Sequence, residues 1–214
     1  MVVAKGGSVA MIWQSYPWKN QLIADAASIK RWASKTQPTA RRSMLIERKV
    51  FLAAYTIRKL DHSYKLSSAA FHDRSLACRT YRAKSKRITL LNNHKIDELY
   101  DLDCANAETI SARQLMDIII HSLVFGEVLG DDLTLKAFLV TSDRRKSRLW
   151  EIKTDAFVEL MHDVGNDDPA YAHYVSNPDT GEFVVWQGSS GSPPPSFEER
   201  AQRILETVLK SSRP

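Results

Sequence analysis

The spacing of apolar residues predicts a pair of helices near the start of the chain. From Trp18 to Trp32, apolar residues recur every three or four positions after Pro17, and proline is well tolerated in a first helical turn. A longer run with the same spacing extends from Ile46 to Tyr64 and follows Thr39, a residue type that caps helices. We expect the two helices to form a hairpin with a shared core. The residues expected in this core are Trp18, Leu22, Ile29, Val50, Ile57 and Leu60.

The middle of the chain also favours helix. Ser67 or Ser68 could cap a third helix that runs to about Arg82, and a short strand is expected at 87–91. A fourth helix is expected after Ser111, ending at Gly126 or Gly130. Residues 16–126 are therefore predicted to be mainly helical.

Apolar and polar residues alternate after residue 133, which is the period of a β-strand. Two hairpins are predicted here, with a short helix between them that is capped by Asp155 and ends at Gly165. The second hairpin would turn through 177–181, which is rich in turn-forming residues. The predicted strands are Leu133–Leu139, Arg148–Thr154, Tyr171–Ser176 and Glu182–Gln187.

Together these elements predict an α+β fold. An N-terminal helical hairpin or bundle would pack with a C-terminal antiparallel sheet of two hairpins, followed by a tail helix. Three consecutive prolines, Pro193–Pro195, indicate an extended, solvent-facing linker. The predicted organisation is a flexible N-terminus at 1–15, a single domain at 16–188 (helical at 16–126, strand-rich at 133–187), a linker at 189–196 and a C-terminal helix at 197–214.

Composition narrows the class of protein. No uninterrupted apolar stretch reaches the roughly 18 residues that a membrane span needs, and no apolar segment of signal-peptide length lies near the N-terminus. The two cysteines, Cys78 and Cys104, have no Cys-x-x-Cys spacing. We therefore expect a cytoplasmic protein without a disulfide framework, a thiolate zinc site or a membrane span.

Charge is distributed unevenly along the chain. Residues 1–100 contain 19 Lys and Arg and 6 Asp and Glu (+13), whereas residues 101–214 contain 11 and 19 (−8). The basic half could form a surface for a polyanion such as nucleic acid. Alternatively, the two halves could attract each other, within one chain or between subunits.

The densest basic segment suggests a candidate site for nucleic acid. Cations of this kind contact phosphates, and an aromatic residue among them could stack on an unpaired base. The same run could also be a solvated surface that keeps the protein soluble. The candidate residues are Arg74, Arg79, Tyr81, Arg82, Lys84, Lys86 and Arg87.

Two weaker patterns would fit a nuclease. Asp143 and the Glu151-Ile152-Lys153 triplet resemble the acidic residue and Glu-x-Lys strand with which restriction-type nucleases hold a divalent metal. Asp143, however, follows its predicted strand in a basic loop, and such triplets are common on half-exposed strands. Surface charges on a hairpin are the simpler interpretation.

The second pattern is Arg87 and His94, six residues apart. This spacing resembles the Arg-x(4–6)-His motif of the HEPN ribonucleases, which are all-helical proteins. The resemblance implies that the arginine and the histidine of paired subunits would meet at the scissile phosphate. It covers two residues, and it departs from the family because 87–91 is predicted to be extended and the C-terminal hairpins have no counterpart.

The leading hypothesis is a nucleic-acid-associated or partner-binding protein without an evident catalytic set. A small metal-dependent or HEPN-like nuclease is the alternative, and a structural subunit assembled through opposite charges is a third. Neither RNA nor DNA is favoured, and self-association stays open. No cofactor or metal is expected, because the chain has no Gly-rich phosphate loop, no dinucleotide fingerprint and no recognised ligand spacing.

Overall fold

A computed structural model describes residues 12–189 and 191–211, so the first eleven residues of the predicted N-terminal segment lie outside it. Two long helices form the predicted hairpin, α1 (Tyr16–Ala33) and α2 (Ala40–His62). Thr39 caps α2, because its side chain accepts a hydrogen bond from the backbone N–H of Arg42 at 3.1 Å. No helix in the described ranges is long and apolar enough to cross a membrane.

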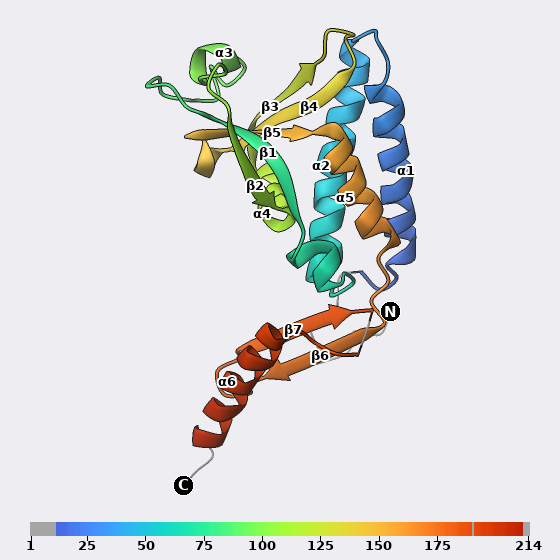
Figure 1. The fold of residues 1–214 in the computed structure, drawn as a ribbon, viewed down its shortest axis with the longest axis vertical. Helices are drawn as coiled ribbons and strands as arrows, with labels where there is room; N and C mark the ends of the chain where they lie inside the picture. The colour runs from blue at the N-terminus through green and yellow to red at the C-terminus, as the bar shows by residue number, and fades with distance from the viewer. Residues whose placement is uncertain (1–11, 190, 212–214) are drawn as a thin grey trace, which may run out of the picture.

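In the same ranges, five strands form one antiparallel sheet in the order β2-β1-β5-β4-β3. Together with the helices they confirm the α+β class. Figure 1 shows α1, α2 and α5 beside this sheet. The strands are β1 (Ser75–Arg82), β2 (Asn106–Ser111), β3 (Ser122–Leu129), β4 (Leu135–Ser142) and β5 (Arg148–Lys153). The shorter elements are η1 (Ser68–His72), α3 (Ile96–Leu99), α4 (Ala112–Ile120), η2 (Asp143–Arg145) and α5 (Thr154–Asn166).

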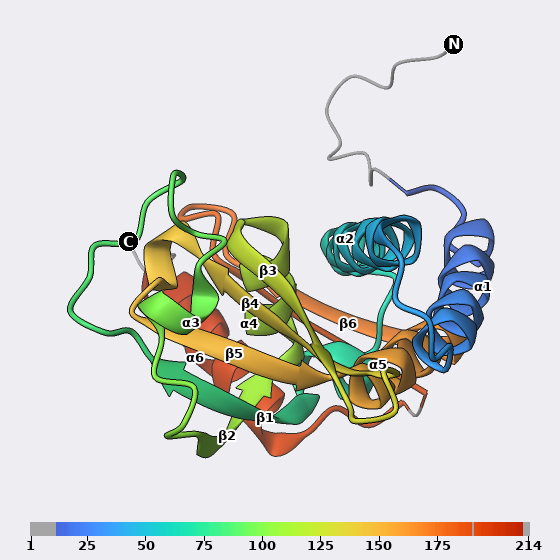
Figure 2. The ribbon, with the colours of Figure 1, turned by 90° about the horizontal axis from the view of Figure 1, so that it is seen from above.

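The main core lies between the helices and one face of the sheet. Apolar side chains of β4 and β5, such as Phe138 and Ile152, meet α5 residues there, and Phe138 packs edge-to-face on Phe157. A second apolar cluster covers the opposite face near α3, where Tyr100 is fully buried. Viewed from above, the sheet runs from the α1–α2 pair towards α3 (Figure 2). The sheet therefore carries α3 at the end that is far from the long helices.

The chain ends in a separate layer, which we call the C-terminal unit: β6 (Tyr171–Ser176), β7 (Phe183–Gly188) and α6 (Pro195–Ser211). The two strands form the predicted hairpin, and Gly181 takes the positive φ of 70° that its turn requires. Phe197 and Ile204 of α6 pack on Trp186 of β7. Figure 1 places this unit beyond the lower ends of α1 and α2.

The segment between β7 and α6 is shorter than the linker that the sequence predicted. Pro194 precedes α6 in an exposed position, as expected of an extended, solvent-facing segment. Pro195, however, is the first residue of α6, a position where proline loses no helical hydrogen bond. The helix therefore begins inside the segment that was expected to be the linker.

The prediction of a helix at 67–82 is wrong. Only η1, a single π-helical turn, is helical there, and β1 follows it. Leu76, Cys78 and Thr80 are buried while Ser75 and Ala77 are exposed, which is the alternation of a strand. The short strand predicted at 87–91 does not form either, because the backbone is irregular at 87–89 and enters a turn at residue 90.

The predicted helix after Ser111 does form, but it ends at Ile120 and the chain then enters β3. Gly126 is therefore not a helix stop. It lies inside β3, where the Ile96 side chain packs over it, and a Cβ atom at this position would come within 2.8 Å of the Ile96 Cδ1 atom. With β1, β2 and the start of β3 inside residues 16–126, that region is mixed rather than mainly helical.

The predicted helical core is confirmed with one exception. Leu22, Ile29, Val50, Ile57 and Leu60 are all buried in the main core. Trp18 is instead 41% exposed, because it lies in the first turn of α1, at the edge of the stripe.

Candidate nucleic-acid interface

Exposed cations gather at the end of the sheet near α3 and come from two segments. The first follows β1 and runs from Arg82 to Lys95 without an acidic residue. The second is the β4–β5 connection, which contains Arg144, Arg145 and Lys146 and leads to Arg148. We call these residues the basic end. It consists of Arg82, Lys84, Lys86, Arg87, Lys95, Arg144, Arg145, Lys146 and Arg148.

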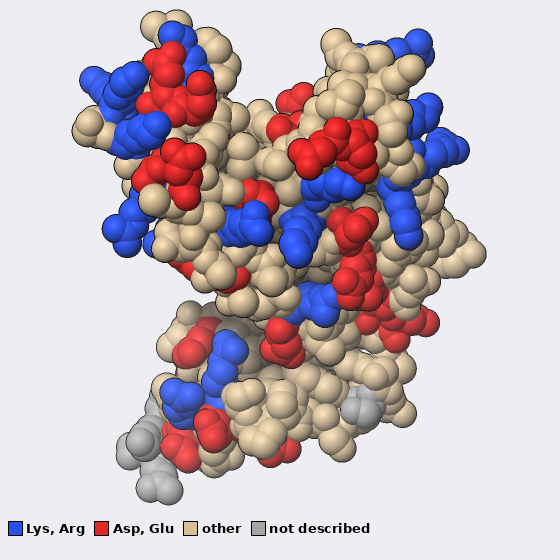
Figure 3. All heavy atoms as spheres, turned by 45° about the horizontal axis from the view of Figure 1, so that its top comes forward, with Lys and Arg blue, Asp and Glu red and all other residues tan. Residues whose placement is uncertain are grey.

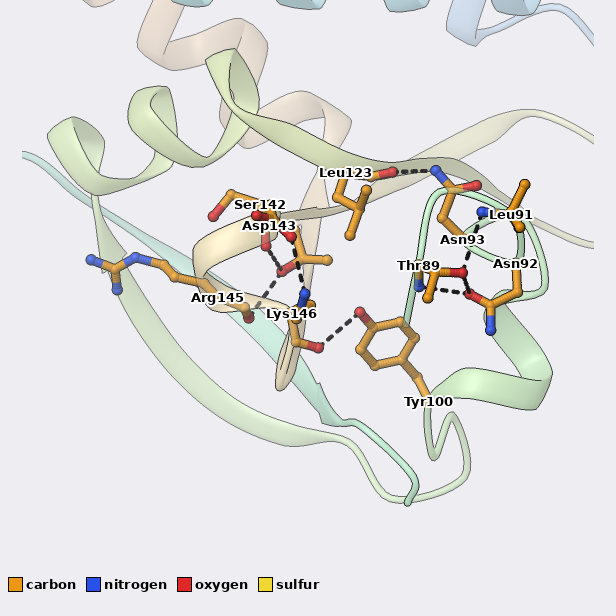
Figure 4. Close-up of polar contacts among 11 residues, drawn as sticks. Thr89, Leu91, Asn92, Asn93, Tyr100, Leu123, Ser142, Asp143, Arg145 and Lys146 are labelled. Carbon is orange, nitrogen blue, oxygen red and sulfur yellow. Dashed lines mark hydrogen bonds and ion pairs between the residues drawn. The ribbon is translucent and has the colours of Figure 1, made fainter. Parts of the chain in front are cut away.

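Strand pairing brings the two segments together. β1 lies antiparallel to β5 with Arg82 opposite Arg148. Beyond this pair, the backbone N–H of Ala83 donates to the carbonyl of Ser147 at 3.0 Å. The Tyr100 hydroxyl donates to the carbonyl of Lys146, also at 3.0 Å (Figure 4). Residues more than forty positions apart in the sequence thus share one end of the sheet.

The first segment has an ordered tip. The Asn92 side chain accepts hydrogen bonds from the backbone and hydroxyl of Thr89 and donates to the carbonyl of Arg87. Asn93 donates to the carbonyl of Leu123 in β3 at 2.7 Å, which fastens the tip to the sheet (Figure 4). This turn holds Leu90 and Leu91 in solvent, where they are 79% and 88% exposed.

Several of these cations already have acidic neighbours. Glu98 pairs with Lys86 at 3.1 Å and with Lys95 at 3.5 Å, and the hydrogen bond from Lys86, followed by the charge of Lys95, lowers the pKa of Glu98. Arg148 pairs with Glu108 at 2.7 Å, and Lys146 pairs with Asp143. Within the described ranges, the cations of the basic end that form no ion pair are Arg82, Lys84, Arg87, Arg144 and Arg145.

The remaining candidates of the basic run lie elsewhere or are engaged. Arg74 lies at the other end of β1 and pairs with Glu159 and Asp163 of α5 at 3.0 and 2.9 Å. Arg79 lies 3.8 Å from Glu151. Tyr81 is buried, so its ring does not face solvent, and its hydroxyl hydrogen-bonds to Glu151. Burial, then the bond to Glu151, raises the pKa of Tyr81 to about 12.

Some of the uneven charge is satisfied inside the chain. The basic first half and the acidic second half meet in ion pairs such as Arg58–Asp117 at 3.0 Å. Figure 3 accordingly shows Lys and Arg interspersed with Asp and Glu over much of one face. The same kind of cross-half pair is formed by Arg42–Glu127, Arg74–Glu159, Arg74–Asp163 and Arg79–Glu151.

The candidates for a metal-dependent nuclease do not converge. Glu151 lies opposite Leu139 in β4, whereas Asp143 follows Ser142, the last residue of that strand. Three residues of strand separate Leu139 from Ser142 by about 10 Å, too far for two carboxylates to share one ion. Glu151 is held by Arg79 and Tyr81, and Lys153 is exposed. The described residues contain no group of three His, Cys, Asp or Glu placed to hold a metal.

The HEPN-like pair lies in the tip of the first segment. Arg87 and His94 are both exposed and flank the turn built by Thr89 and Asn92. They therefore stand on a loop and not on a helix, which is a further departure from the all-helical family. No interaction joins them within the described residues.

Sequence reasoning missed the second segment of the basic end. Residues 143–147 are recognisable as a polar hairpin loop, but their proximity to 82–95 depends on the pairing of β1 with β5. That pairing was hidden because β1 was predicted to be helical. Comparison with models of known protein families, with curated proteins and with solved structures finds no match for this chain.

Proposed function

We propose that the protein binds nucleic acid through the basic end. The observation that carries the proposal is the convergence of two exposed basic segments, five of whose cations form no ion pair within the described ranges. Cations with no acidic partner can contact phosphates without first breaking an internal pair. Leu90 and Leu91 would add apolar contact, as wedge residues do in proteins that pry bases apart.

The test measures affinity for single- and double-stranded RNA and DNA over a salt series. Replacing Arg82, Arg87, Arg144 and Arg145 with Ala should weaken binding to all sequences, because phosphate contacts do not read bases. Each lost contact should reduce the slope of log affinity against log salt by about 0.7–0.9, so the quadruple variant should lose up to about 3.6. All four side chains are exposed, and the fold should be retained.

A matched variant controls for net charge. Lys30, Arg31, Arg41 and Arg48 are exposed on α1 and α2, and replacing all four with Ala removes the same charge far from the basic end. This variant should keep the wild-type salt slope. Equal losses in the two variants would show that net charge alone drives binding, and a wild-type protein without salt-dependent affinity would refute the proposal.

A nuclease is separated from a binding protein by the length of the nucleic acid after incubation. If His94 were catalytic, His94→Ala would abolish cleavage and leave affinity nearly unchanged. The binding proposal expects intact substrate with both the wild-type protein and this variant.

A further inference from the structure

A cleft at the opposite end of the body has the chemistry of a second ligand site. It lies where the C-terminal unit meets the lower ends of α2 and α4, and its volume is about 610 Å³. This volume is in the range of small-molecule pockets, roughly 300–1,000 Å³. Figure 3 shows the surface hollowed between the body and the C-terminal unit.

The cleft contains a histidine fixed by a buried carboxylate. The His72 Nε2 atom lies 2.9 Å from the Asp61 carboxylate, whose side chain is only 8% exposed. Arg58 pairs with the other oxygen of Asp61 at 2.8 Å and also with Asp117 at 3.0 Å, so the position of the Asp61 carboxylate is fixed. With Nε2–H donating to Asp61, the Nδ1 atom of a neutral His72 is an acceptor for a ligand hydroxyl.

Cations line the cleft from two separate elements. Arg113 comes from the first turn of α4 and Arg200 from α6, and both are exposed without an ion pair in the described ranges. Asp73 is the opposing carboxylate, because Asp61 is already paired. The two arginines balance the charges of Asp61 and Asp73, and because neither arginine has an ion-pair partner in the described ranges, both are available to a phosphate.

Aromatic rings complete the lining. Tyr64 and Phe183 approach edge-to-face with centroids 6.4 Å apart, and they are 40% and 54% exposed. Tyr64 has a φ of 54°, a left-handed conformation that non-glycine residues adopt at a cost. Its carbonyl accepts from Gln187 at 2.6 Å, so the C-terminal unit itself holds Tyr64 in the cleft. Exposed rings in such a place can stack on a planar base.

We propose that this cleft binds a nucleotide. Tyr64 and Phe183 would contact the base, Arg113 and Arg200 the phosphate, and the free nitrogen of His72 a ribose hydroxyl. The inference does not depend on the basic end, because it uses other residues at the other end of the molecule.

Calorimetric titration of the full chain with adenosine 5′-monophosphate tests the proposal, with adenosine and inorganic phosphate as partial ligands. The monophosphate should bind saturably and at least about tenfold more tightly than either part, a difference of about 1.4 kcal/mol. Arg200→Ala and Arg113→Ala should each weaken it about tenfold. Arg203→Ala, one turn further along α6 and outside the cleft, is the matched control and should bind like the wild type.

Two further variants separate the contacts. Phe183→Leu should weaken binding of the monophosphate and of adenosine but not of inorganic phosphate, since it removes only the ring. His72→Ala should discriminate less between adenosine 5′-monophosphate and its 2′,3′-dideoxy analogue. Absence of saturable binding, equal losses in Arg200→Ala and Arg203→Ala, or binding of a phosphopeptide but not of the nucleotide would each overturn the proposal.

Discussion

At the residue scale, the two cysteines occupy contrasting environments. Cys78 lies on the core side of β1, and burial, followed by the charge of Glu108, raises its pKa to about 11. Cys104 is exposed, and its pKa is also raised, chiefly by the charge of Asp101. Only thiolates react readily with disulfide reagents, so burial and pKa together protect Cys78.

We therefore expect one reactive thiol in the native protein and two after denaturation, counted with Ellman's reagent near neutral pH. Cys104→Ser should remove the native reaction, whereas Cys78→Ser should leave it intact. Two equally fast thiols in the native wild type would contradict the buried position of Cys78.

Two tyrosines make stability sensitive to alkali. The pKa values of Tyr81 and Tyr100 are both raised to about 12, with burial the largest cause in each case. A phenol whose pKa is raised by folding contributes stability that is fully present below its unfolded pKa of about 10. That contribution is lost as the pH rises from the pKa of the unfolded state through the pKa of the folded state.

The protein should consequently lose stability between about pH 10 and pH 12. When the pH is raised, part of the tyrosinate absorbance should appear only near pH 12. This late part of the titration should be smaller in Tyr81→Phe and in Tyr100→Phe. Tyr100→Phe also removes the hydrogen bond to Lys146, which should lower the free energy of unfolding at neutral pH by about 1 kcal/mol. An unchanged late part of the titration in both variants would show that other tyrosines titrate last.

At the element scale, the ordered tip that carries Leu90 and Leu91 depends on one side chain. Asn92 makes three hydrogen bonds that close the turn, and Asn92→Ala removes all of them without changing charge. We expect this variant to bind nucleic acid several-fold more weakly, because a mobile tip must be ordered on binding.

The salt slope should be unchanged in Asn92→Ala, since no cation is lost. Amide hydrogen exchange should become faster at 87–95 and stay as in the wild type in β4 and β5. Leu90→Ser with Leu91→Ser is the companion variant, which keeps the turn and removes only the apolar surface. If it binds as tightly as the wild type, the leucines do not contact the nucleic acid.

The long helices α1 and α2 each bury one face, which is the apolar stripe that the sequence predicted. The helices α1 and α2 and the strands β4 to β7 all lie close to their expected bounds. The edge strands that it missed lack such a face. Only Ile110 is buried in β2 and only Val124 in β3, because both lie at the edges of the sheet. An edge strand with mixed exposure leaves little alternation in the sequence.

The candidate site was predictable only in part, for a related reason. Arg82, Lys84 and Arg87 were found because they are neighbours in the chain. Arg144 and Arg145 join them through long-range strand pairing, which local patterns do not encode. The cleft of Asp61 and His72 likewise depends on how α2, η1 and β7 meet.

At the scale of the whole molecule, the C-terminal unit has its own apolar cluster, separate from the main core. Helix α5 belongs instead to the body, since Phe157, Leu160 and Val164 are fully buried in the main core. We expect a chain that ends at residue 168 to fold, because it keeps α5. A chain that ends at residue 153 should not fold, since it loses several buried side chains, each worth about 2–5 kcal/mol.

Circular dichroism and thermal melting of the two shortened chains test this expectation. Cooperative melting of the shorter chain would show that α5 is dispensable. An unfolded longer chain would show that residues 16–188 need each other as one unit, which is the organisation that the sequence predicted.

Asp167, just after α5, connects distant parts of the body. Its carboxylate accepts from the backbone and the hydroxyl of Ser67 at 2.7 and 2.6 Å, and its carbonyl accepts from the buried Lys19 of α1. During synthesis, α1 and the start of η1 therefore leave the ribosome long before the residue that joins them. Until α5 emerges, the apolar stripe of α1 is not covered by the helix that packs most on it. Until β5 emerges, the edge of β1 that pairs with β5 has no partner strand. Ribosomes that pause before α5 has emerged would hold a chain prone to aggregation, so slow translation should be tolerated better after α5 emerges than before.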